Sequence, residues 1–159
     1  MANEVSTAGL TLKYAIEASG SAGTRPTTGY TQVARIKSVP DLNPTPGSID
    51  VTDLSDLEWK RSIPGLKDVG GAVAFKANNT DEFQTGWAAI VSAWETAQAA
   101  SGGPLAMWFE LSHPRLAKAF YFAGQPSPLG LSAAEVDAAL EIDAYITPNQ
   151  VAGWATKST

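Results

Sequence analysis

The residues best suited to chemistry in this sequence are four carboxylates near its C-terminal end. Glu135, Asp137, Glu141 and Asp143 occupy odd positions of residues 134–146, where apolar residues fill every even position. Such period-two alternation predicts a β-strand, so the four side chains are expected to share its polar face. Carboxylates on one face lie about 6.6 Å from their neighbours and repel one another, so that face should meet solvent or cations.

Other arrangements that could support chemistry are incomplete. The chain has no cysteine, which excludes a thiolate nucleophile and a sulfur-based zinc site. A Ser–His–acid relay would need His113, the single histidine, which falls in an expected turn between two strands. Asp50, Asp53 and Asp56 recur at every third position, whereas a calcium loop uses alternate positions. We therefore expect a protein that is not an enzyme and that holds no cofactor and no metal.

The composition excludes further classes of protein. The 159 residues include 44% hydrophobic residues, which is typical of a single globular domain. The net charge of −5 makes nucleic-acid binding improbable, because phosphate is bound by lysine and arginine. The N-terminus is polar, and the uncharged apolar run at residues 85–94 is about half the length of a membrane helix. We expect synthesis in a cytoplasm, without secretion or membrane insertion.

The remaining elements follow from hydrophobic periodicity. Alternation predicts strands over residues 10–18, 31–39, 69–77, 105–111 and 134–146, with another around Phe120 and Phe122. Apolar residues at three- and four-residue spacing predict one helix over 81–100, with Thr80 as its N-cap. Trp87 and Trp94 lie on the apolar stripe of that helix and are expected in the core. The residues from 148 onward are expected to form a short polar tail.

A long segment between the early strands has no clear secondary structure. Residues 40–68 are rich in proline, with one short strand possible within 48–54. Compact domains rarely keep such long loops without a use. The segment is either a mobile surface loop or an arm that becomes ordered against a partner. Together the elements predict a mainly β (α+β) fold in one domain spanning 1–159, an antiparallel β-sandwich or partial barrel with a flanking α-helix.

The order of these segments resembles the major tail tube protein of long-tailed, non-contractile bacteriophages, the siphophage tail tube family. The similar segments are RIKSVPDL at 35–42, IDVTDL at 49–54, IPGLKD at 63–68, KANN at 76–79 and DAYITP at 143–148. The resemblance covers roughly residues 10–148.

This resemblance implies a phage tail tube-like fold and a structural virion protein that self-assembles. Members of the family form hexameric rings that stack into a tube, the conduit for DNA ejection into the host. The implied partners are the chain itself and the tape-measure, tail terminator and baseplate or distal tail proteins, while DNA passes through without specific binding.

Two sets of residues acquire roles through the resemblance. The acidic residues Glu135, Asp137, Glu141 and Asp143 would line the lumen, where negative charge repels DNA. The long loop would contact the adjacent ring and become ordered on assembly, through Pro40, Asp41, Leu42, Ile49, Asp53, Trp59, Ile63, Leu66 and Asp68.

Two other functions stay open from the sequence. One is a monomeric β-sandwich that binds carbohydrate, with Trp59 and Trp154 as stacking platforms. The other is a small hydrolase that uses the acidic cluster, which would require a paired acid and base in an apolar pocket.

Overall fold

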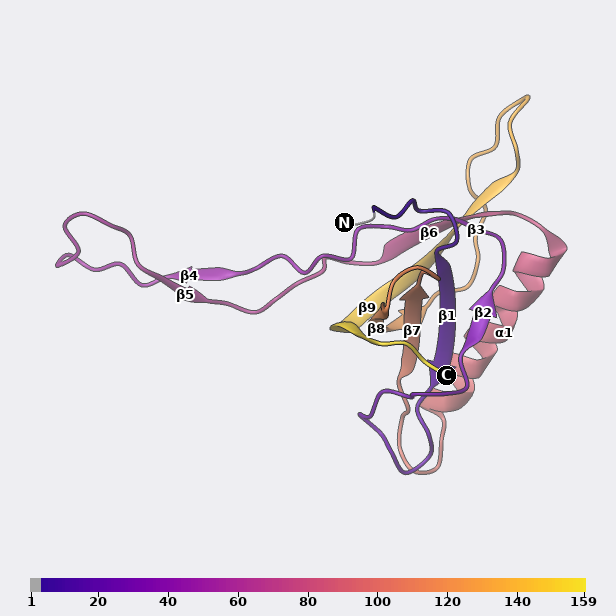
Figure 1. Cartoon of the computed structure of the whole chain (residues 1–159), viewed down its shortest axis with the longest axis horizontal. Coiled ribbons are helices and arrows are strands. Elements are labelled where there is room, and N and C mark those ends of the chain that lie inside the picture. Colours follow the sequence, from indigo (N-terminus) through magenta and orange to yellow (C-terminus); the bar gives the residue numbers. More distant parts are fainter. Residues whose placement is uncertain (1–3) are drawn as a thin grey trace.

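A computed structural model describes residues 4–159. In chain order its elements are β1 (Thr11–Ile16), β2 (Thr31–Val33), β3 (Ile36–Ser38), β4 (Ser48–Asp50), β5 (Ser62–Pro64), β6 (Val73–Asn78), α1 (Asp81–Gln98), β7 (Met107–Ser112), β8 (Lys118–Pro126) and β9 (Glu141–Thr156). The prediction of a mainly β fold with one flanking helix is confirmed (Figure 1).

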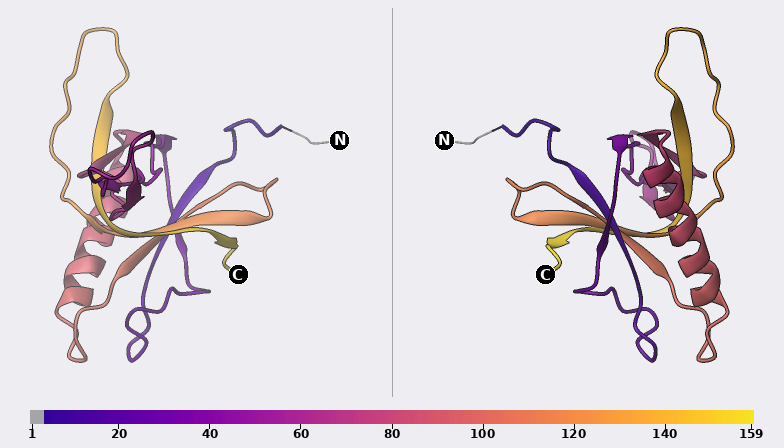
Figure 2. Two further views of the ribbon diagram at one scale, coloured as in Figure 1. Left: turned by 90° about the vertical axis from the view of Figure 1, so that its left-hand side faces the viewer. Right: turned by 90° about the vertical axis from the view of Figure 1, so that its right-hand side faces the viewer.

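Seven strands form one antiparallel sheet in the order β2-β1-β7-β8-β9-β6-β3. Its two edge strands, β2 and β3, are consecutive in sequence, and only Ala34 and Arg35 separate them. The sheet must therefore curl until its edges meet, which gives a nearly closed barrel (Figure 2). The single strand predicted over 31–39 is wrong, because Arg35 adopts a left-handed conformation (φ 65°) that breaks the extended backbone.

Helix α1 covers one face of this sheet. Thr80 caps it as predicted, since its Oγ1 accepts a hydrogen bond from the Phe83 amide at 3.2 Å. Trp87 is buried and Trp94 partly buried against the same core, so their predicted core positions are confirmed. The Trp87 indole N–H donates to the Ser127 carbonyl at 2.8 Å, which ties the helix to the end of β8.

The opposite face of β7 and β8 is also covered. Trp108 and Tyr121 form a second apolar cluster there, and Tyr30 packs edge-on against Tyr121 with ring centroids 6.0 Å apart. Every residue of β7 is buried as a result. The sheet is thus sandwiched at its centre, with α1 on one side and the 17–30 loop on the other.

The last strand lies in a different place from the prediction. Residues 127–140 form a connection that protrudes from the body (the gold loop of Figures 1 and 2), and β9 begins only at Glu141. Strand β9 pairs with β6 through residue 146 and with β8 from residue 146 to its end. No strand of the described chain pairs with residues 134–140, and Asp137 has a φ of 61°. The expected polar tail from 148 is instead the second half of β9.

The segment 40–68 is a projecting ribbon rather than an irregular loop (Figure 1). The short strand expected within 48–54 exists as β4, and it pairs with a second strand, β5, that the sequence did not predict. We call residues 43–68 the arm. The chain enters it through Leu42, which is buried in the core.

Candidate assembly surfaces

The base of the arm is held by backbone contacts. The Thr45 amide donates to the Asp68 carbonyl at 2.7 Å, and the Gly65 amide donates to the Gly47 carbonyl at 2.9 Å. The two strands approach so closely that a Cβ on Gly47 would lie 2.6 Å from the Leu66 carbonyl oxygen. Glycine at this position therefore allows the ribbon to close.

The far end of the arm is closed by its own hydrogen bonds. The Thr52 hydroxyl accepts from the Arg61 amide at 2.9 Å, and the Val51 amide donates to the Arg61 carbonyl at 3.0 Å. The Arg61 guanidinium lies 3.3 Å from Asp56 and 3.9 Å from Asp53. Hydrogen bonds from Ser55 lower the pKa of Asp53. The arm thus has internal order, whereas the sequence suggested a loop that becomes ordered only on assembly.

Large apolar side chains on the arm contact no core. Leu54, Leu57 and Trp59 are exposed to 101%, 91% and 81%, and Leu66 near the base to 94%. Contiguous exposed apolar residues mark interaction surfaces. We call Leu54, Leu57 and Trp59 the arm tip.

The nine residues predicted to contact an adjacent ring fall into three groups in the structure. Pro40, Asp41 and the buried Leu42 form the root, Asp68 closes the base, and the exposed residues Ile49, Asp53, Trp59, Ile63 and Leu66 lie along the arm. Leu42 belongs to the core and is only 6% exposed. Contact of the others with a neighbouring ring stays a prediction.

The four acidic residues do not share one strand face as predicted. Glu135 and Asp137 lie in the protruding connection, and only Glu141 and Asp143 lie on β9. Glu141 forms an ion pair with Lys37, whose hydrogen bond and charge lower its pKa. The alternation across 134–146 does not give one strand because a strand also needs a neighbouring strand, which residues 134–140 lack among the described residues. Which acidic residues face a lumen stays a prediction.

Strand β9 exposes a backbone edge that the sequence did not reveal. Its residues 147–156 pair with β8 on one side, and no described strand pairs with the other side. Pro148 lies in this part of β9, which suits an edge because proline has no amide proton to donate. Proline and the register shifts against β8 are devices that limit uncontrolled pairing of free edges.

Trp154 on this half of β9 stands at the meeting point of two shallow apolar grooves. It is 57% exposed and packs edge-on against Phe120, with ring centroids 5.7 Å apart. One groove, of about 260 Å³, extends to the root of the arm, and the other, of about 400 Å³, is lined by Leu116, Ala117 and Lys118. We call these two together the Trp154 groove. The sequence singled out Trp154 but not its neighbours, which come from distant segments.

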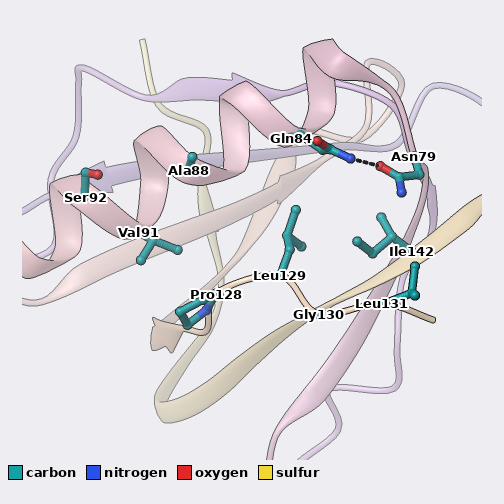
Figure 3. Close-up of a pocket in the computed structure, with 10 residues that line it drawn as sticks. All are labelled: Asn79, Gln84, Ala88, Val91, Ser92, Pro128, Leu129, Gly130, Leu131 and Ile142. Atoms are coloured by element: carbon teal, nitrogen blue, oxygen red, sulfur yellow. Dashed lines mark hydrogen bonds between the residues drawn. The ribbon is translucent and has the colours of Figure 1, made fainter.

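A larger cavity of about 520 Å³ lies between α1, residues 128–131 and β9 (Figure 3). Its walls are mainly apolar, with Val91, Leu129 and Ile142 among the side chains shown. At its rim the Gln84 side-chain amide donates to Asn79 Oδ1 at 2.6 Å. No titratable side chain is among the described residues that line it, so this cavity does not supply the acid and base of a hydrolase.

A buried carboxylate outside the predicted sites organises the covered face of β7 and β8. Glu110 is 1% exposed and accepts hydrogen bonds from the Tyr121 hydroxyl at 2.7 Å and the Ser158 amide at 3.1 Å, with the Lys13 ammonium 4.0 Å away. Burial raises the pKa of Glu110, but the hydrogen bonds from Ser158 and Tyr121 and the charge of Lys13 outweigh it and lower the pKa overall.

Neighbouring polar groups on this face are satisfied in the same way. Glu17 accepts from the Trp108 indole N–H at 3.0 Å and from two backbone amides. Arg25 stacks over the Tyr121 ring, 3.9 Å from its centroid, and burial raises the pKa of Tyr30 to about 12. His113 is buried in the turn after β7, where its Nε2 lies 2.7 Å from the Ala8 carbonyl oxygen. These contacts hold loops and the C-terminus on the sheet.

Two further searches cover residues 4–159. In that range no group of three or more His, Cys, Asp and Glu side chains is arranged to hold a metal ion. No helix in the same range is long and apolar enough to span a bilayer.

Comparison with known proteins identifies the fold. No family model matches the sequence, and no curated protein matches it. Among solved structures, the chain is similar to one chain of the cryo-EM structure of the anti-feeding prophage (AFP) baseplate, 6-fold symmetrised. The TM-score is 0.57 at 9% sequence identity, and the match covers 95% of each chain. The chain therefore shares its overall fold with that chain of the prophage baseplate structure.

Proposed function

We propose that this chain is a structural protein of a phage-type tail, which associates with copies of itself into stacked hexameric rings. The observation that carries the proposal is the arm, a hydrogen-bonded ribbon whose apolar tip has no contact with its own core. Exposed Leu54, Leu57 and Trp59 at the end of an ordered ribbon are typical of a surface that another chain covers. The similarity to a subunit of a 6-fold symmetrised prophage baseplate supports this class of assembly.

The free edge of β9 supports lateral association. Residues 147–156 leave one row of backbone groups without a strand partner in the described chain. Pairing between subunits around a ring would satisfy those groups and remove the edge. The part of the sheet face that neither α1 nor the 17–30 loop covers would then face inward.

In the proposed tube the lumen conducts DNA toward the host without binding it. The net charge of −5 suits a conduit, because an acidic wall repels phosphate. The proposed partners are tape-measure, tail terminator and baseplate or distal tail proteins, and the proposed location is the virion, after synthesis in the host cytoplasm. The chain is proposed to have no enzymatic activity.

Electron microscopy of the purified chain at rising concentration tests this proposal. We expect rings or hollow tubes, and we expect a variant in which a short Gly-Ser turn replaces residues 46–66 to form no tubes, because it keeps the free edge of β9 but lacks the arm. The variant should keep its near-ultraviolet circular dichroism, because the core residues lie outside the deleted segment. Wild-type chain that stays monomeric, alone and with the other tail proteins, would contradict the proposal.

Carbohydrate binding by a monomer is the second candidate. It is favoured by the exposure of Trp59 and Trp154, since aromatic rings can stack on sugars. The two residues lie on separate elements, the arm and β9, so each would be a platform of its own. Quenching of tryptophan emission by a sugar, in a chain that stays monomeric, would support this function and oppose the first.

A further inference from the structure

Besides Val136 in the protruding connection, the apolar surfaces that residues 4–159 leave uncovered include the arm tip, the Trp154 groove and the cavity beside α1. The first is convex and the other two are concave. The arm tip therefore has two possible receptors within the described chain. The first observation below concerns which copy supplies the arm, and the other two concern which receptor the arm fits.

The first observation concerns reach. The Trp154 groove extends to Pro40 and Leu42, at the root of the same arm. The arm tip lies about ten residues beyond the Thr45–Asp68 bridge, which is about 33 Å along an extended ribbon. A paired ribbon cannot fold back on itself over that length without losing its hydrogen bonds. The chain's own arm tip therefore cannot occupy this groove, and an arm tip that docks there must come from a second copy.

The second observation is charge. The end of the arm carries four acidic residues against two basic ones (Asp50, Asp53, Asp56 and Glu58 against Lys60 and Arg61). The lining of the Trp154 groove has one acidic and one basic residue, Asp41 and Lys118. The neighbouring segments 111–123 and 144–159 add Arg115 and Lys157 and contain no acidic residue, so the surroundings of the groove are positive. The α1 cavity has a neutral lining and lies near acidic residues of the helix. Charge complementarity favours the Trp154 groove.

The third observation is the aromatic anchor. Trp154 is held by Phe120 while much of its surface stays exposed. Interfaces concentrate their binding energy in such residues, and tryptophan on one partner tends to meet a similar anchor on the other. Trp59 of the arm tip supplies that second anchor.

We propose that the arm tip of one copy docks in the Trp154 groove of a second copy. This inference rests on the proposed function, since it names the contact between successive subunits. Each copy has one arm tip and one groove, so head-to-tail contacts can continue without limit. Trp59 buries only about 150–250 Å² in such a contact, against about 800 Å² per partner in a stable complex. One contact is thus weak, and its repetition around a ring makes stacking cooperative.

Cysteine cross-linking tests the contact directly, because the natural chain has no cysteine. We expect L57C/L116C, treated with a short thiol-specific cross-linker, to give a ladder of dimers, trimers and larger species on a denaturing gel. Leu57 and Leu116 are both at the surface, so both substitutions should leave the fold intact. Each single variant should remain mainly monomeric, and a mixture of the two should give one heterodimer.

The matched control places the second cysteine in the rival receptor. L57C/S92C carries it in the α1 cavity, and we expect no ladder from this variant. A ladder from L57C/S92C but not from L57C/L116C would overturn the inference.

Charge reversal supplies a second readout. K118E should lower the cross-linking yield of L57C/L116C about two- to five-fold, the range for an exposed ion pair, and added E58K should restore it. Failure of E58K to restore the yield would oppose the contact.

The outcomes of microscopy and cross-linking together distinguish the two proposals. Tubes without the ladder would refute this contact and leave the proposed function intact. A ladder without rings or tubes would refute the proposed function and leave the contact.

Discussion

At the scale of single residues, Glu110 links three parts of the chain. It lies on β7, accepts a hydrogen bond from Tyr121 on β8, and holds the backbone of Ser158 after β9. A buried carboxylate is tolerated only when its oxygens are paired. Here the hydrogen bonds are sufficient to lower the pKa of Glu110 despite its burial, so the charged form stabilises the folded state.

Replacing this residue gives a prediction for stability and pH. E110Q should lower the free energy of unfolding by about 1–3 kcal/mol at pH 7, because the amide cannot accept as the carboxylate does. The pKa of Glu110 is lower in the folded chain than its usual value of 4.5, so its contribution is present above pH 4.5 and lost as pH falls below it. Urea unfolding at pH 7 and at pH 3 should therefore show a smaller difference for E110Q than for the natural chain.

The matched control is E95Q, which changes an exposed glutamate on α1. It should leave both the stability and its pH dependence nearly unchanged. Equal effects of E110Q and E95Q would show that the hydrogen bonds of Glu110 do not stabilise the fold.

At the scale of elements, the arm depends on the close approach of its two strands. The arm is joined to the body only at its two ends, through the root and through residues 69–72 that lead into β6, so its order comes from backbone hydrogen bonds and from the contacts of Arg61. Ribbons of two strands are only marginally stable by themselves. Gly47 is the position where a side chain would meet the opposite backbone.

The substitution G47V should therefore open the arm and leave the body intact. The expected result is faster tryptic cleavage after Lys60 and Arg61, with the free energy of unfolding of the body changed by less than about 0.5 kcal/mol. Limited proteolysis followed by mass spectrometry measures the cleavage. The control G71A adds a Cβ where no atom lies within 4 Å, and it should be cleaved at the natural rate. Equal cleavage in G47V and G71A would exclude the proposed role of Gly47.

At the scale of the whole molecule, the helix decides which face of the sheet can line a lumen. Helix α1 covers the face that bears Ile142, Ala144 and Ile146, so Glu141 and Asp143 lie on the other face. Each of these carboxylates has a lysine beside it. Glu141 forms an ion pair with Lys37, and Asp143 is the Cα partner of Lys76 on the neighbouring strand β6. In the proposed tube these acidic residues neutralise two lysines that would otherwise attract passing DNA.

Removing the negative charges of Glu141 and Asp143 should make the tube retain DNA. E141Q/D143N leaves Lys37 and Lys76 without acidic partners, and tubes of this variant should bind short DNA at 50 mM salt and release it by 200 mM salt, as phosphate contacts do. The control E135Q/D137N makes the same change of charge in the protruding connection and should not retain DNA. Co-sedimentation of labelled DNA with the tubes measures both. Equal retention by the two variants would contradict a lumen lined by β9.

Much of the fold could be predicted from local pattern. The mainly β class, the helix beginning after Thr80 and the core positions of Trp87 and Trp94 follow from periodicity and capping, which involve neighbouring residues only. The candidate surfaces could be predicted in part, since the long segment 40–68 and Trp154 stood out by length and residue type. The groove around Trp154 could not, because its walls come from β8, β9 and the arm root.

The sequence by itself determined which residues alternate between polar and apolar, and tertiary structure decided which of those alternating residues became strand. Residues 134–140 and 141–146 alternate equally well, yet only the latter have β6 beside them, and the residues after 146 become strand because β8 runs alongside. The second strand of the arm and the burial of Glu110 likewise depend on contacts with other segments of the chain. The physical reason is that a strand is stabilised by hydrogen bonds to distant segments, and its own sequence does not specify where those segments lie.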